Sequence, residues 1–151
     1  MTGIPSEAAV RAWTRLIRAR ERVLGGVEAD LRRAGFPPLA WYDALLELRR
    51  AAPDGLRPFV LERRMLLPQY GVSRLVDRLE AAGHLRREPA PEDGRGQLLR
   101  ITRSGRGLLA RMWPAYAAAI ERHLGARLEE EEAAALARLL DRLLAADQAG
   151  T

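Results

Sequence analysis

Arginine side chains gather in the middle of the chain, where their number suits contact with a polyanion. The 151-residue sequence contains arginine but no lysine. Residues 57–106 hold eleven arginines and six acidic residues, which gives this segment a net charge of +5. Residues 1–56 carry +2 and residues 107–151 carry −2. A basic centre indicates a negatively charged partner such as nucleic acid. Solvated helix faces in an arginine-rich protein would give the same composition, so charge alone leaves both interpretations open.

Segment Pro68–Ala82 is the first candidate for this contact. Its apolar spacing predicts a helix with an inward face formed by Val72, Leu75, Val76 and Leu79. The polar side chains that remain outside are Gln69, Tyr70, Ser73, Arg74 and Arg78. A helix with such a face can enter the major groove of DNA. Gln69 and Tyr70 are expected to meet bases from the first turn. Arg74 suits a guanine edge or a phosphate, and Ser73 suits a phosphate. An ordinary amphipathic surface helix is the alternative.

The stretch "PAPEDGRG", residues 89–96, predicts a hairpin loop between strands at 84–88 and 97–102. Arg95 is flanked by glycines, so we expect its guanidinium to enter a narrow minor groove, where the negative potential is enhanced. Asp93 is expected to hold the loop and to orient Arg95 by a charge-assisted hydrogen bond. Three arginines on the expected strands extend the basic surface: Arg86, Arg87 and Arg100. Of these, Arg87 is expected to contact DNA.

Amphipathic helices are predicted on both sides of this centre. The order is helix, helix, a short stretch "LRPF" that could pair with another strand, helix, helix, hairpin, helix, helix, which predicts a mainly α winged helix-turn-helix with a small β-hairpin wing. Residues 35–106 are the expected DNA-binding lobe. Residues 1–34 and 107–151 are expected to be dimerisation helices, because their apolar faces are too wide for a small domain to cover alone. The expected helices run from Ser6 to Gly35, Leu39–Ala51, Val60–Leu66, Pro68–Ala82, from Thr102 through Pro114 to Leu124, and Glu129–Ala146.

Several function classes are disfavoured. The sequence has no cysteine, and its two histidines, His84 and His123, are far apart, so a metal site is not expected and no cofactor is implied. No nucleophile, base and orienting group stand together as an enzyme would need. No apolar run approaches the roughly 20 residues of a membrane span, and the first ten residues lack a secretion signal. We therefore expect a cytoplasmic protein that is not an enzyme, nucleoid-associated when bound to DNA.

The stretch "VSRLVDRLEAAGHLRREPAPEDGRGQLLRITRSGRGLL" resembles the multiple antibiotic resistance regulator (MarR) family of bacterial transcription factors. The resemblance rests on the "SRLVDRLEAAG" helix, the "EDGRG" wing and the "ITRSGRGLL" helix entry, and the flanking helices match in order and length. It implies a homodimer whose terminal helices form the interface and whose two wings straddle a pseudo-palindromic operator in double-stranded DNA. It also implies a repressor that a small, often aromatic, effector releases from DNA.

The chain departs from the family pattern in three places. The helix "VLERRMLL" is more charged than usual, Ile101 replaces a commoner leucine, and Glu129 stands where a serine or threonine cap is frequent. The absence of cysteine excludes the oxidation-sensing members of the family.

An effector pocket is expected where the first two helices and the helix after the wing meet the lobe. Its candidate lining residues are Trp13, Ile17, Trp41, Met112 and Tyr116, with Tyr42 and Trp113 also available. At helical spacing such residues are more often core than ligand contacts. A different class of function is also open: a winged-helix module whose basic face docks an acidic protein and not DNA.

Overall fold

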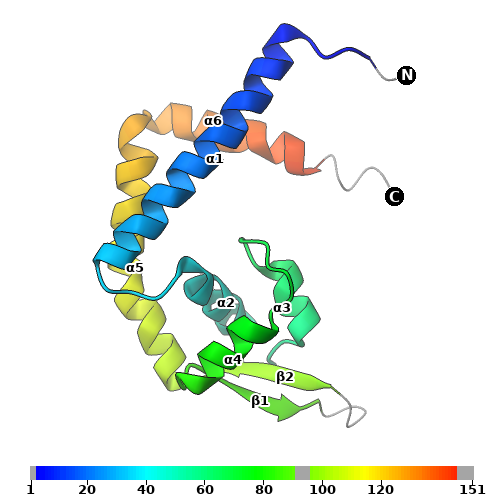
Figure 1. The fold of residues 1–151 in the computed structure, drawn as a ribbon, viewed down its shortest axis with the longest axis vertical. Coiled ribbons are helices and arrows are strands. Elements are labelled where there is room, and N and C mark those ends of the chain that lie inside the picture. Colours follow the sequence, from blue (N-terminus) through cyan, green and yellow to red (C-terminus); the bar gives the residue numbers. More distant parts are fainter. Residues whose placement is uncertain (1–2, 91–95, 146–151) are drawn as a thin grey trace. The chain divides into compact units, whose positions relative to one another are not determined.

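The computed structural model of the chain describes residues 3–90 and 96–145. Within this part, six α-helices and a short 3-10 helix accompany one antiparallel hairpin (Figure 1). The mainly helical winged helix-turn-helix predicted from the sequence is confirmed. The bounds are α1 Glu7–Arg33, α2 Leu39–Arg50, α3 Pro58–Arg64, α4 Ser73–Ala81, β1 Leu85–Pro89, β2 Gln97–Ile101, α5 Arg103–His123, the 3-10 helix Gly125–Arg127, and α6 Glu130–Ala145.

The chain divides into two compact units. Residues 30–116 form the first, which we call the lobe, and it contains α2, α3, α4 and the hairpin. Residues 1–29 and 117–151 form the second, which we call the helical unit. The long helices α1 and α5 each have one end in either unit.

The core of the lobe is built from leucines that the amphipathic pattern places inward. Leu45 of α2, Leu61 of α3, Leu79 of α4 and Leu99 of β2 are completely buried. Burying a leucine contributes roughly 1.5–3 kcal/mol, so these contacts supply much of what fixes α4 in the lobe. Val72, Leu75 and Val76 are buried as well, which confirms the predicted inward face of this helix.

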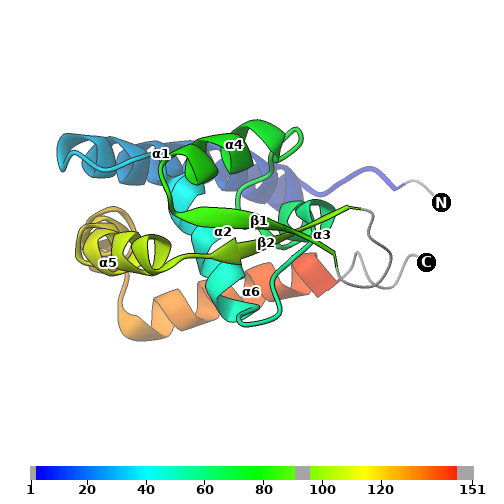
Figure 2. The ribbon, with the colours of Figure 1, turned by 90° about the horizontal axis from the view of Figure 1, so that it is seen from below.

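The hairpin is paired to a third segment at Leu99, the central residue of β2. Leu85 stands opposite Ile101, and Pro89 opposite Gln97. Leu56 donates its N–H to the carbonyl oxygen of Leu99 at 3.0 Å and accepts the N–H of Leu99 at 2.7 Å. The prediction that the "LRPF" stretch pairs with another strand is therefore confirmed. Figure 2 shows the two strands side by side, with α4 along them.

Capping residues define both ends of α1, as predicted. The Ser6 hydroxyl oxygen accepts the N–H of Ala9 at 3.0 Å, which satisfies a free donor of the first turn. Gly35 follows the last turn at φ 83°, a left-handed conformation that glycine adopts without a side-chain penalty.

The prediction for α3 was wrong by two residues, since this helix covers Pro58–Arg64 and not Val60–Leu66. Pro58 occupies its first position, where the missing N–H leaves no hydrogen bond unmade.

In the helical unit α1 and α5 approach closely. A Cβ atom on Gly26 would lie 2.5 Å from the ring of His123, so any larger residue there would force this ring to move. No helix among residues 3–90 and 96–145 is long and apolar enough to cross a membrane.

Candidate nucleic-acid interface

Helix α4 turns one face into the lobe and leaves the other in solvent. Ser73, Arg74 and Arg78 are exposed, whereas Leu75 and Leu79 are buried. Arg74 and Arg78 are four residues apart, so both guanidinium groups project from the same side of the helix. This is the arrangement that a helix entering the major groove requires.

The start of α4 differs from the prediction. The helix begins at Ser73, and the expected first turn from Pro68 is irregular backbone. Gly71 adopts φ 72°, which is incompatible with a helix, and Val72 is the N-cap residue. Gln69 and Tyr70 therefore lie in the loop before α4 and not on its first turn. The glycine at position 71 was the signal in the sequence that could have indicated this break.

Arg87 of β1 is turned towards α4. Its guanidinium donates to the carboxylate of Asp77 at 2.5 Å and to that of Glu80 at 2.6 Å. The hydrogen bond to Asp77 and the nearby charge of Glu80 raise the pKa of Arg87. The side chain that was predicted to contact DNA thus joins the wing to α4, and its placement favours a role in orienting these two elements.

Replacing Arg87 by alanine is expected to lower stability by about 1 kcal/mol, because two partly exposed ion pairs are lost. We expect the dependence of DNA affinity on salt concentration to keep its slope, since the carboxylates of Asp77 and Glu80 already engage the guanidinium. Thermal unfolding and DNA titrations at several salt concentrations measure the two effects. A slope reduced by about one would instead assign Arg87 to a phosphate.

Charges at the base of the wing are balanced within the hairpin. Arg86 and Arg100 stand opposite each other, an unfavourable pairing of like charges. Glu88 lies between them, with Oε1 at 3.0 Å from Arg86 Nε and Oε2 at 2.5 Å from Arg100 Nε. Arg100 also donates to the carbonyl oxygen of Pro53.

The expected contacts at the tip of the wing, Asp93 and Arg95, lie outside the described residues.

The junction between α4 and α5 is fixed by Thr102. Its hydroxyl donates to the carbonyl oxygen of Gly83 at 2.6 Å and accepts the N–H of Gly105 at 3.1 Å, which confirms the predicted cap. These two hydrogen bonds hold the turn that follows α4 against the start of α5. Arg103 and Arg106 are exposed in the first turn of α5.

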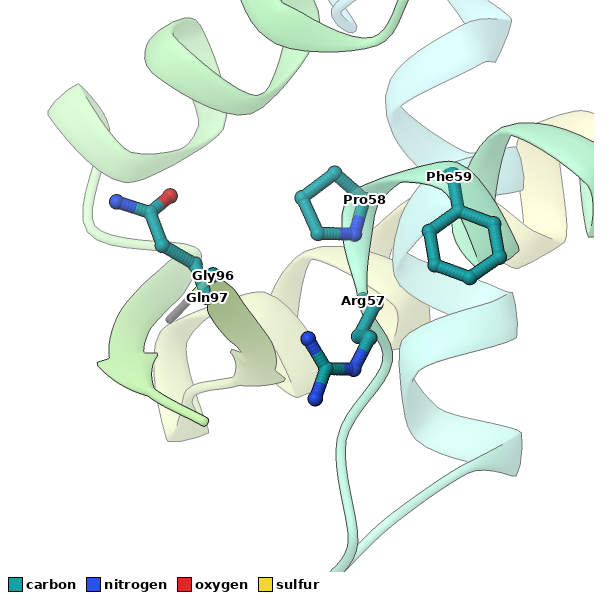
Figure 3. Close-up of a pocket in the computed structure, with 5 residues that line it drawn as sticks. All are labelled: Arg57, Pro58, Phe59, Gly96 and Gln97. Atoms are coloured by element: carbon teal, nitrogen blue, oxygen red, sulfur yellow. The ribbon is translucent and has the colours of Figure 1, made fainter. Parts of the chain in front are cut away.

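A cavity of about 640 Å³ opens between the start of α3 and the start of β2. Figure 3 shows that Arg57, Pro58 and Phe59 line it on one side, with Gly96 and Gln97 on the other. A second cavity of about 190 Å³ lies between the end of α2 and the base of the wing. Neither cavity is lined by the expected effector-binding residues.

Those residues are divided between the two units. Trp13 and Ile17 belong to the helical unit, where Trp13 is 65% exposed. Met112 is completely buried in the lobe, and Trp41 packs edge-on against the ring of His84 at 5.9 Å between centroids. Tyr116 packs against the rings of Tyr42 and Trp113.

The lobe contains a cluster of three aromatic rings. Tyr42 lies 5.0 Å from Tyr116 and 6.4 Å from Trp113, and Trp113 lies 5.8 Å from Tyr116, all between ring centroids. Tyr42 is buried and Trp113 is half exposed. Among the described residues, no group of three or more histidine or acidic side chains is arranged to hold a metal ion.

Comparison with known proteins identifies one family. The family model described as "MarR family" matches residues 34–96. The crystal structure of AbsC, a MarR family transcriptional regulator from Streptomyces coelicolor, is similar with a TM-score of 0.82 and 22% identity over 98% of this chain and 99% of that one. Sco3205, a MarR family transcriptional regulator from the same organism solved in complex with DNA, gives 0.82 and 27% over 96% and 90%.

A third similar structure concerns regulation of DNA binding. It is that of Bordetella bronchiseptica BpsR, whose DNA binding is regulated by 6-hydroxynicotinic acid, with a TM-score of 0.77 and 22% identity over 93% of this chain and 97% of that one. The comparison with curated protein sequences gave no match.

Proposed function

Because this chain belongs to the MarR family of winged-helix transcriptional regulators, we propose that it is a homodimeric repressor that reads a pseudo-palindromic DNA operator. The family consists of DNA-binding regulators and not of enzymes. Two lobes in a symmetric dimer would place two copies of α4 in successive major grooves, as the winged-helix geometry requires.

One observation carries the DNA-binding proposal: the exposed face of α4 presents Arg74 and Arg78 while the opposite face is buried in the lobe. Ser73 lies at the start of the same helix, beside the loop with Gln69 and Tyr70. We assign Arg74 and Arg78 to base edges or phosphates, and Ser73 to a phosphate. Arg95 remains the proposed minor-groove contact, with Asp93 as its orienting partner.

Helix α6 supports the proposed dimer. It spans sixteen residues, yet none of them is buried in the single chain. An isolated helix of this length is marginally stable in water, so a partner surface is needed. Leu136, Leu139 and Leu143 form an exposed apolar stripe on α6, and α1 exposes a second stripe that includes Trp13 and Ile17. A second copy of the chain would bury both stripes.

Release by a small aromatic effector is the regulatory part of the proposal. The half-exposed ring of Trp113 and the adjoining Tyr42 and Tyr116 offer apolar faces of the kind such a ligand stacks on. A ligand that binds better to a dimer with the wrong spacing of its α4 helices would shift the population away from DNA. Among the residues predicted for this role, Trp41, Met112 and Tyr116 stay candidates in the lobe, and Trp13 and Ile17 in the helical unit.

Replacing Arg74 by alanine is expected to weaken operator binding by roughly 10- to 100-fold, because a direct contact to DNA is lost. The measurement is a titration of a labelled duplex, taken from upstream of the protein's own gene, at several salt concentrations. A salt slope lowered by about one assigns Arg74 to a phosphate, and an unchanged slope with relaxed sequence preference assigns it to a base.

The matched control for this experiment is Arg127→Ala, which removes the same charge from the 3-10 helix of the helical unit, outside the apolar stripes of α1 and α6. It is expected to leave operator affinity unchanged. Equal affinity of the Arg74 variant and the unmodified protein would contradict the assignment. If no duplex competes better than random DNA, the basic face is a docking site for an acidic protein instead.

A further inference from the structure

Two carboxylates hold the loop of residues 66–72 that connects α3 to α4. At its first end, Asp43 of α2 accepts the N–H of Leu66 at 2.9 Å and the N–H of Leu67 at 2.7 Å. At its far end, Glu62 of α3 accepts the N–H of Gly71 at 3.1 Å. The loop lacks regular secondary structure, so these bonds replace the backbone pairing that a helix would have supplied.

The two bonds made by Asp43 use different oxygen atoms. Oδ1 accepts from Leu66 and Oδ2 accepts from Leu67, so two consecutive N–H groups share one carboxylate. Asparagine has the same shape but only one acceptor oxygen, and its amide group would face an N–H donor. An ionised aspartate is therefore the residue that can satisfy both groups at once.

Burial of the Asp43 carboxylate carries a free-energy cost. Its side chain is 6% exposed, and burial raises the pKa of its carboxyl group even though the hydrogen bonds from Leu67 and Leu66 act in the opposite direction. An apolar side chain in the same place would avoid the desolvation of a charge. The advantage of an aspartate here lies in the conformation that it imposes on the loop.

The loop held in this way presents side chains beside the exposed face of α4. Tyr70 is fully exposed and Gln69 is half buried, between the two points of attachment. An aromatic ring on a fixed backbone can contact a thymine methyl group or stack on a sugar, and a glutamine can pair with adenine. Such contacts discriminate between sequences only if the backbone does not move.

We propose that Asp43 and Glu62 are positioning residues for DNA recognition, which hold the loop of residues 66–72 as a base-reading element that carries Gln69 and Tyr70 ahead of α4. The inference rests on the proposed DNA-binding function. It assigns part of the sequence specificity to a loop outside the recognition helix, and it makes two acidic residues that do not touch DNA necessary for that specificity.

The first experiment compares Asp43→Asn with Glu47→Gln, both in the full-length protein. Glu47 is a buried carboxylate one turn further along α2, and it pairs with Arg50 of the same helix at 2.7 Å. The probes are a duplex selected from random sequence by the unmodified protein and a scrambled duplex of the same composition.

For Asp43→Asn we expect affinity for the selected duplex to fall about tenfold, with affinity for the scrambled duplex and the salt slope unchanged. Glu47→Gln is expected to keep the ratio of the two affinities. A preserved ratio in Asp43→Asn would overturn the inference.

A double-mutant cycle with Tyr70→Ala tests whether Asp43 acts through the loop. Tyr70→Ala is expected to weaken binding to the selected duplex by about tenfold in the unmodified protein, and by less than threefold when Asp43→Asn is already present. Independent, multiplicative effects of the two changes would contradict the proposal, because they would separate Asp43 from the side chain that it is said to position.

Hydrogen exchange supplies a measurement without DNA. In Asp43→Asn, the N–H groups of Leu66 and Leu67 are expected to exchange faster, while those of Leu79 and Met112 in the core keep their protection. Uniformly faster exchange would show that Asp43 only stabilises the fold, and would overturn the inference.

The selection step separates the two proposals. If the unmodified protein enriches no sequence, the DNA-binding proposal fails and the loop's role fails with it. If a sequence is enriched and Asp43→Asn binds it with full specificity, only the inference about the loop fails.

Discussion

Replacing Gly105 by alanine is expected to destabilise the protein by about 3 kcal/mol, because the new methyl group meets fixed backbone. Gly105 is buried in the first turn of α5, and a Cβ atom there would lie 2.2 Å from the carbonyl oxygen of His84 and 2.8 Å from Cγ1 of Ile101. The carbonyl group cannot retreat, since it accepts the N–H of Thr102 at 3.1 Å. The junction between α4, the wing and α5 would have to open.

Thermal unfolding measures this effect, and a fall in Tm of roughly 10 °C is expected for a chain of this size. Gly107→Ala is the matched control in the same helix. Its Cβ atom would meet only the guanidinium end of Arg111, at 3.2 Å, which can move aside. Since alanine favours a helix over glycine by up to about 1 kcal/mol, the control is expected to be neutral or slightly stabilising. Equal Tm values for the two variants would contradict the steric argument.

Introducing glutamate at both Leu139 and Leu143 is expected to convert the proposed dimer into monomers and to reduce operator affinity by at least 100-fold. These leucines are 54% and 59% exposed in the single chain, and they lie on one side of α6. Burying two unpaired carboxylates in an apolar interface would be strongly unfavourable. A monomer also loses the simultaneous binding of two half-sites, which multiplies the affinity of a linked pair.

Light scattering gives the mass in solution, and a titration with the operator duplex gives the affinity. The double variant Ala134→Glu, Ala145→Glu adds the same charge to the opposite side of α6, where both alanines are exposed. It is expected to remain dimeric and to bind DNA normally. A Leu139→Glu, Leu143→Glu protein that is still a dimer would place the interface elsewhere.

Local patterns were sufficient to predict the elements and the inward faces of the lobe. The period of the apolar residues identified the buried side of α4, including Leu75 and Leu79, and the residue types at Ser6 and Thr102 identified two helix caps. These features depend on residues within a few positions of one another, so one sequence contains the whole signal.

Features that depend on distant residues were not predicted. The hydrogen bonds that hold the loop before α4, from the N–H groups of Leu66 and Leu67 to Asp43, join residues more than twenty positions apart. The ion pairs that Arg87 forms with Asp77 and Glu80 in the folded lobe were not predicted either, and its contact with DNA stays a prediction. No local pattern records such pairings, because they arise only when α2, α4 and the wing have come together.

Because of the bridge between Leu56 and Leu99, the stability of the hairpin does not depend on the length of the segment that links its strands. Both hydrogen bonds at this bridge, together with the pairs from Leu85–Ile101 to Pro89–Gln97, close the hairpin below the segment that links its strands. Insertions or exchanges in that segment would leave these bonds in place, and lengthening a closed loop carries only a small entropic cost. Related regulators could therefore differ in this segment and keep the same fold. We expect the protein to fold when the segment between residues 90 and 96 is replaced by that of another regulator.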